Sequence, residues 1–167
     1  MSTSTSTRST RTRRVEHPVV NPATLPATTH SYLSRAADSL HEAVQATDVP
    51  TRYACAHVAA LRAAAALLAA RALPATGRRK QKSAWVLLTE VAPEFSEWAA
   101  FFAAGASKRA AAEAGSTRAV TEREADDLVR DADRFLAVVE GALGLVPHSS
   151  AGQAAAALGA GVRSGVA

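Results

Sequence analysis

A long run of Ala and Leu, residues 52–73, constrains the fold more than any other part of this chain. It reads RYACAHVAALRAAAALLAARAL and contains neither Gly nor Pro. Ala and Leu are the strongest ordinary helix formers, so the run predicts one continuous helix. Since small apolar residues also flank its main stripe, we expect a central helix that is covered on more than one side. The stripe itself consists of Tyr53, His57, Leu61, Ala64 and Leu68.

A first helix is expected before this central one. Thr28 or Thr29 is suited to be its N-cap, and the apolar spacing continues to about Ala46. Leu33 and Val44 are among the residues predicted to face the core.

A second helical region follows the central helix. Ser83 is a suitable N-cap, and Pro93 is expected to break the helix that it starts. The turn that begins at Pro93 carries most of the aromatic residues, at a spacing typical of core packing. Residues 105–115 favour a helix but have Gly at both ends, so their structure stays open. The aromatic residues of this region are Phe95, Trp98, Phe101 and Phe102.

The last helix has the clearest signals. Thr121 and Glu124 form a capping box, helical periodicity continues to Leu143, and Gly144 supplies the C-terminal stop. Together with short connections and the lack of strand patterns, these segments predict an all-α, up-down bundle of four to five helices over residues 28–146.

Two terminal segments are expected to be disordered. Residues 1–27 are basic and rich in Ser, Thr and Pro, a composition that an organelle transit peptide shares. Residues 147–167 are rich in Ala and Gly. These tails also carry the whole net charge of +4, because residues 28–146 contain 14 Lys and Arg against 14 Asp and Glu. The sequence therefore predicts no basic face on the bundle.

Several functional classes are disfavoured by residues that are missing. The single Cys55 excludes an intramolecular disulfide and a cysteine zinc cluster, and it suits the cytoplasm. No metal-ligand spacing or phosphate-binding Gly loop occurs, so we expect no metal and no cofactor. Because Arg52, Arg62 and Arg71 interrupt the most apolar run, no membrane association is expected.

Two segments resemble the HEPN domain family. RYACAHVAALRAAAALLAAR is similar to the second helix of these domains, with an aromatic and small residues around a His. KRAAAEAGSTRAVTEREADDLVRDADRFLAVVEGAL is similar to their end, with a basic residue, a loop and an acidic helix start. SAWVLLTEVAPEF lies where their third helix does. The resemblance covers residues 28–146 and points to a small stand-alone bacterial branch of the actinobacterial type.

The resemblance implies a helical bundle that often forms a homodimer. Many HEPN domains are metal-independent endoribonucleases with an Arg-x4-6-His motif near the start of the last long helix, whereas others bind RNA, a nucleotide or a protein partner. At the corresponding position Arg109 is not followed by a His. The leading hypothesis is therefore a non-catalytic binding domain. Its candidate binding residues are Arg78, Arg79, Lys80, Lys82, Lys108 and Arg109.

An enzymatic alternative rests on Arg52 and His57. This pair has the motif spacing, as do Arg35/His41 and Arg11/His17, but chance alone predicts about one such match in this chain. Arg52 and His57 are about 140° apart on a helix, so their side chains point in different directions. The position of His57 on the apolar stripe is explained equally well by a buried core His. A purely structural or regulatory interaction bundle is the third hypothesis.

Overall fold

The computed structural model describes residues 21–71 and 82–149. Within these ranges the chain forms six α-helices and two short 3-10 helices, without a strand. The elements are η1 (Pro22–Thr24), α1 (Ala27–Gln45), α2 (Val49–Arg71), α3 (Ala84–Val91), η2 (Pro93–Phe95), α4 (Ser96–Ala104), α5 (Ala106–Glu113) and α6 (Glu122–Ala142). The predicted all-α bundle is confirmed.

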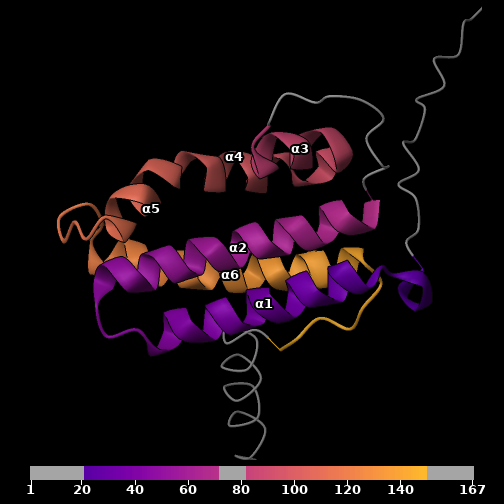
Figure 1. Ribbon diagram of the computed structural model, residues 1–167, viewed down its shortest axis with the longest axis horizontal. Coiled ribbons are helices and arrows are strands. Elements are labelled where there is room, and N and C mark those ends of the chain that lie inside the picture. The colour runs from indigo at the N-terminus through magenta and orange to yellow at the C-terminus, as the bar shows by residue number, and fades with distance from the viewer. Residues whose placement is uncertain (1–20, 72–81, 150–167) are drawn as a thin grey trace, which may run out of the picture.

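The helices form an up-down bundle of four arms. Its third arm consists of three short helices, α3, α4 and α5, in place of one long helix. α1 and α2 are antiparallel, α3, α4 and α5 lead back along the other side of α2, and α6 closes the bundle (Figure 1). Two hydrogen bonds show that α2 and α6 are parallel. Arg52 near the start of α2 binds Asp126 near the start of α6, and Arg71 at the end of α2 binds the carbonyl of Ala142 at the end of α6.

The third arm is broken where the sequence contains Pro and Gly. α3 ends before Pro93, as predicted, and Ala92 leaves the helical region with φ −138° and ψ 74°. A second break lies at Gly105, between α4 and α5. The open question of residues 105–115 is thereby answered, because Ala106–Glu113 is helical.

Most of the predicted helix caps are confirmed. Ser83 accepts a hydrogen bond from the backbone N–H of Val86, and Thr121 and Glu124 form the complete capping box. Gly144 has a positive φ of 74° just beyond α6. The start of α1 differs from prediction, because Pro26 precedes its first residue and Thr29 is buried within its first turn instead of capping it.

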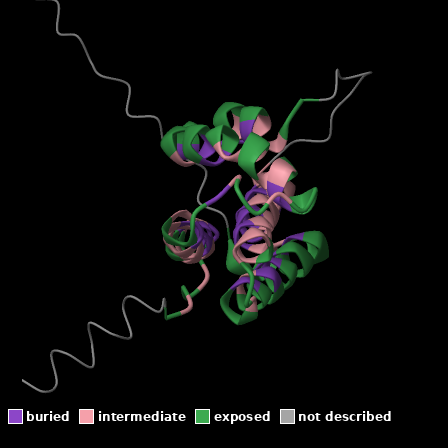
Figure 2. Ribbon diagram, turned by 90° about the vertical axis from the view of Figure 1, so that its left-hand side faces the viewer, coloured by how far each residue is buried: buried purple, intermediate pink, exposed green. Residues whose placement is uncertain are grey.

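The inward sides of the helices carry the buried residues (Figure 2). On α2 the buried face is broad, as expected, and it consists largely of Ala, with Leu67 as its one buried Leu. Leu61 and Leu68, predicted for the core stripe, are only half-buried. On α1 Val44 was predicted to face the core, but 62% of it is exposed. Its neighbour Ala43 is buried instead. The buried residues of α2 are Tyr53, Ala56, His57, Ala59, Ala60, Ala63, Ala64, Ala66 and Leu67.

By length and composition alone, α2 would be able to cross a membrane, although its arginines had suggested otherwise. Half of its most apolar stretch is buried inside the bundle. The core helix of a bundle meets the same criteria, so this property is weak support for a membrane span.

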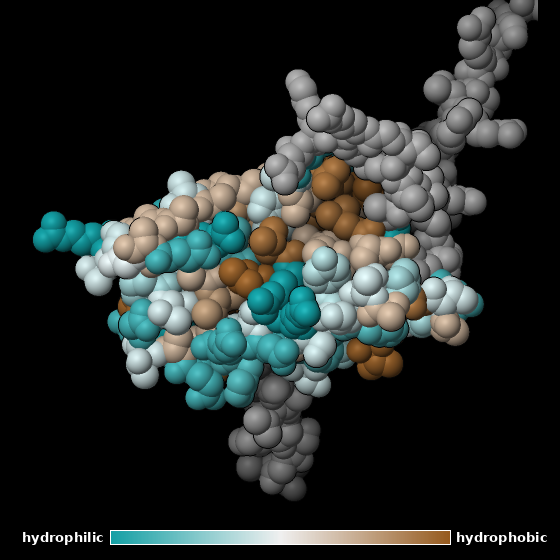
Figure 3. All heavy atoms as spheres, viewed as in Figure 1, coloured by the Kyte–Doolittle hydropathy of each residue, from teal (hydrophilic) through white to brown (hydrophobic). Residues whose placement is uncertain are grey.

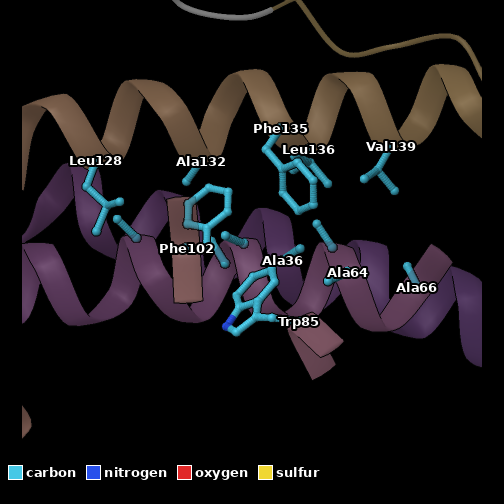
Figure 4. Close-up of a cluster of buried hydrophobic side chains, with 14 of the residues drawn as sticks. Ala36, Ala64, Ala66, Trp85, Phe102, Leu128, Ala132, Phe135, Leu136 and Val139 are labelled. Carbon is cyan, nitrogen blue, oxygen red and sulfur yellow. The ribbon is translucent and has the colours of Figure 1, made fainter. Parts of the chain in front are cut away.

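An aromatic cluster fills the space between α6 and the third arm. Trp85 and Phe102 stack with ring centroids 5.3 Å apart, and Phe135 of α6 lies 5.1 Å from Phe102 (Figure 4). Phe95 packs against Phe135 as well. This confirms the core role of most aromatic residues, but Phe101 is an exception, since 47% of it is exposed.

The ends of the described bundle lie slightly outside the predicted domain limits. Residues 21–27, which were assigned to the leader, contain η1 and the first residue of α1. His148, assigned to the tail, is hydrogen-bonded to Glu140 and Asp133 of α6. The rest of the two predicted tails, residues 1–20 and 150–167, lies outside the described residues.

Candidate functional site

A cleft of about 630 Å³ opens between α2, the end of α4, α5 and α6. Tyr53 and His57 of α2 lie at its base, and Phe101 and Phe102 of α4 form one side. α6 supplies the opposite side with Leu128 and charged residues. On the face that Figure 3 shows, hydrophobic atoms near the middle are bordered by strongly hydrophilic ones. A concave site with an apolar base and a polar rim is the usual form of a binding site.

α2 and the end of α4 approach each other closely at Gly105, beside this cleft. A Cβ atom at this position would lie 2.9 Å from the Tyr53 hydroxyl oxygen and 3.3 Å from Cδ2 of His57. The first distance is shorter than a real Cβ contact, so a larger residue would displace the Tyr53 hydroxyl and press against the His57 ring. Gly105 therefore leaves room for the two side chains at the base of the cleft.

His57 is a neutral, structural hydrogen-bond donor. Its Nε2 lies 2.8 Å from the carbonyl oxygen of Phe102, and because a carbonyl only accepts, Nε2 must carry the proton. Nδ1 is then unprotonated, and it is buried without a partner in the described part of the chain. Only 1% of His57 is exposed, and this burial lowers its pKa below the usual 6.5. We conclude that His57 holds α2 to α4.

Tyr53 brings an unpaired hydroxyl to the base of the cleft. The residue is 5% exposed, and burial raises the pKa of its phenol. Lys108 and Glu124 are close enough to influence this pKa, but neither forms a hydrogen bond with the hydroxyl, and no other partner occurs among the described residues. This hydroxyl lines the cleft and is available to a ligand.

The rim of the cleft carries equal numbers of positive and negative charges. Each cation is paired with a carboxylate, one pair linking α5 to α6 and two lying within α6. The hydrogen bond from Lys108, together with the capping bonds of Thr121, lowers the pKa of Glu124 to about 2. The three pairs are Lys108–Glu124, Arg130–Asp127 and Arg134–Asp131.

Arg52 and His57, the candidate catalytic pair, are directed to different neighbours. The guanidinium of Arg52 lies 2.6 Å from Asp126 and donates to the carbonyl of Ala46 at the end of α1. It is not among the residues that line the cleft, whereas His57 faces α4. Arg52 thus caps the end of α1 and forms an ion pair with α6. Its side chain and that of His57 do not meet in one reaction centre.

The candidate binding cations form no single patch. Arg78, Arg79 and Lys80 lie outside the described residues. Lys82 pairs with Glu90 beside α3, while Lys108 and Arg109 are on α5, at the opposite end of the third arm (Figure 1). Arg109 is near Glu113, at 3.8 Å. The charge of each of these three described cations is thus partly balanced by a neighbouring carboxylate.

Sequence reasoning missed the residues that shape the cleft. Phe101 was expected in the core, and Tyr53 was expected to be an ordinary stripe residue. No signal in the sequence indicates that Phe101 differs, because Trp98, Phe101 and Phe102 have the i, i+3, i+4 spacing of a single buried face. In the described residues, no group of His, Cys, Asp and Glu side chains is arranged to hold a metal ion.

Comparison with protein families matches residues 43–140 to the family described as SAV_6107-like HEPN. This match covers more than half of the chain. The chain belongs to the HEPN family. Comparisons with curated proteins and with solved structures gave no match. The expected resemblance is therefore confirmed, and the matched residues of this HEPN domain run from the end of α1 to near the end of α6.

Proposed function

We propose that this HEPN domain is a non-catalytic docking module that binds a polypeptide segment of a partner protein in the cleft. The observation that carries the proposal is the exposed ring of Phe101 between two adjoining hollows whose charged residues do not favour a polyanion. Aromatic side chains at the centre of a concave surface are typical anchors of protein interfaces.

The charge of the site favours a polypeptide over RNA. The lining of the cleft carries three cations and three carboxylates, already paired with one another. RNA affinity depends on Lys and Arg that are free to neutralise phosphates. A polypeptide with mixed charges exchanges such ion pairs without a net electrostatic cost, and its backbone carbonyls are suitable acceptors for the Tyr53 hydroxyl.

A displayed library of random peptides, selected on the full-length protein, tests this function. We expect enriched peptides whose binding is lost in Phe101→Ser, because the exposed ring supplies the apolar anchor. Val86→Ser is the matched control, since Val86 is exposed to a similar extent, 48%, but lies on α3 and lines neither hollow.

Two results would overturn the proposal. One is the failure of any selected peptide to depend on Phe101. The other is tight binding of single-stranded RNA that Phe101→Ser abolishes and Val86→Ser preserves, which would make the cleft an RNA site.

A further inference from the structure

A second hollow, of about 330 Å³, adjoins the cleft beside α4. It is lined by Glu97, Trp98 and Phe101 of α4 and by Asp131 of α6, and we call these four residues the acidic corner. Phe101 and Asp131 line the main cleft as well, so the two hollows form one continuous surface.

The two aromatic rings of the acidic corner stand almost perpendicular to each other. The ring centroids of Trp98 and Phe101 are 6.5 Å apart, with an angle of 86° between their planes. Trp98 is held from behind by Phe102 and Phe135, with ring centroids 5.9 and 5.3 Å away. The indole is therefore a fixed wall, while Phe101 is 47% exposed.

The charges of the acidic corner are negative and only weakly balanced. No Lys, Arg or His lines it among the described residues. Glu97 is exposed and has no ion-pair partner within the described ranges. Asp131 is 3.6 Å from Arg134, whose own side chain is 65% exposed, and burial raises the pKa of Asp131.

We propose that the acidic corner receives the cationic side chain, Arg or Lys, of the docked polypeptide. This inference rests on the docking function proposed above and specifies the chemistry of its anchor. A cation is attracted to the faces of Trp and Phe rings, and carboxylates strengthen the attraction by charge-assisted hydrogen bonds. Arg fits best, because its planar guanidinium stacks on a ring and binds a carboxylate at the same time.

The other kinds of occupant fit less well. A phosphate of RNA would meet two carboxylates and no cation in this hollow. An apolar side chain would cover Asp131 without providing a positive charge. The carboxylate of Asp131 would then be buried at a higher free-energy cost. The hydroxyl of Tyr53 lines the adjoining main cleft, where it is available to the rest of the polypeptide.

Nuclear magnetic resonance on the full-length protein provides a direct test. The probes are N-acetyl-arginine amide and, as the neutral control, N-acetyl-norleucine amide. The chain has two Trp residues, so the indole N–H signal of Trp98 is the reporter and that of the buried Trp85 is the internal reference. We expect a saturable shift of the Trp98 signal with the arginine probe alone.

A pair of charge variants makes the test specific. Glu97→Gln with Asp131→Asn should weaken binding of the arginine probe by about tenfold or more, because both carboxylates are lost. Glu122→Gln with Asp38→Asn removes the same charge from exposed positions outside the corner and should leave the affinity unchanged. Equal shifts with both probes, or unchanged affinity in the corner variant, would overturn the inference.

Failure of this inference is distinguishable from failure of the docking function. Selected peptides that depend on Phe101 but contain no required Arg or Lys would retain the docking function and reject the cationic anchor. Binding of the arginine probe at the acidic corner, without any Phe101-dependent peptide, would retain a cation site and reject the docking function.

Discussion

Nε2 of His57 lies 2.8 Å from the carbonyl oxygen of Phe102 and joins the middle of the bundle to the last turn of α4. The two rings also meet edge to face, with centroids 6.1 Å apart. One imidazole thus provides both a polar and an apolar contact between α2 and the third arm. Both residues line the cleft, so its shape depends on a residue that the enzymatic hypothesis had considered catalytic.

Replacing His57 should destabilise the bundle. We expect His57→Ala to lower the free energy of unfolding by about 2–4 kcal/mol, because it removes a buried hydrogen bond and leaves a cavity among aromatic rings. Urea denaturation measures the change. His41→Ala, at an exposed position, should stay within about 0.5 kcal/mol of the unchanged protein. Equal stability of the two variants would contradict the structural role of His57.

Substitution of Gly105 should disturb the cleft through Tyr53. We expect Gly105→Ala to cost about 1 kcal/mol of stability, since the added Cβ would displace the Tyr53 hydroxyl and press against the His57 ring. In a Tyr53→Phe background the cost should be smaller, because the closest atom is gone. A double-mutant cycle from urea denaturation gives this coupling.

Gly141 offers the matched control for that experiment. A Cβ there would lie 3.7 Å from Cγ of Pro147, an ordinary contact, within the helical part of α6. Gly141→Ala should therefore be neutral or stabilise the protein by up to about 1 kcal/mol. If Gly105→Ala behaved in the same way, the close packing at Gly105 would be refuted.

His148 should make stability depend on pH. Burial alone would lower its pKa, but the hydrogen bonds and charges of Asp133 and Glu140 raise the pKa above 6.5 overall. The stabilisation is thus fully present below pH 6.5 and is lost as the pH rises through the higher pKa of the folded state. Unfolding free energies of the unchanged protein and His148→Ala should converge toward alkaline pH. A constant difference between them would contradict this linkage.

His57 should produce the opposite pH dependence. Its pKa is lowered in the folded state, so its neutral form stabilises the fold above pH 6.5, and this stability decreases as the pH falls below that value. Comparing His148→Ala with and without His57→Gln isolates this contribution. If the free energy of unfolding still decreased with falling pH below 6.5 in the variant without His57, the acid sensitivity would belong to other groups.

We expect no metal-independent cleavage of RNA. Arg52 is held by Asp126 and by the carbonyl of Ala46, and the pKa of His57 favours a buried neutral ring. Incubation with single-stranded RNA in EDTA tests this directly. Cleavage that disappears in both Arg52→Ala and His57→Gln, with both variants still folded by circular dichroism, would restore the enzymatic hypothesis.

The helices were predictable because their signals are local. Ser83, Thr121 and Gly144 act within one turn of the chain, and the caps they form appear as expected. The broken third arm also followed from Pro93. The period of an amphipathic helix, however, does not decide between adjacent apolar residues, and here Phe102 is buried whereas Phe101 is exposed.

The cleft could not be predicted because its contacts are distant in sequence. His57 meets a carbonyl 45 positions away, and Arg52 meets a carboxylate 74 positions away. Such pairings depend on how the helices lie relative to one another, which helical periodicity does not specify. His148 was missed for a related reason, because its acidic partners on α6 are apparent only when the chain folds back.

The Ala-rich face of α2 determines which kind of mutation harms this domain. In most cores the harmful changes are those that remove atoms, and a scan with Ala reveals the important positions. Here six of the nine buried positions of α2 are already Ala, so such a scan has nothing to remove at them. Harm should come from enlargement instead, since a Val or Leu would force tightly packed helices apart. Evolution along this face is therefore limited by an upper size for each side chain.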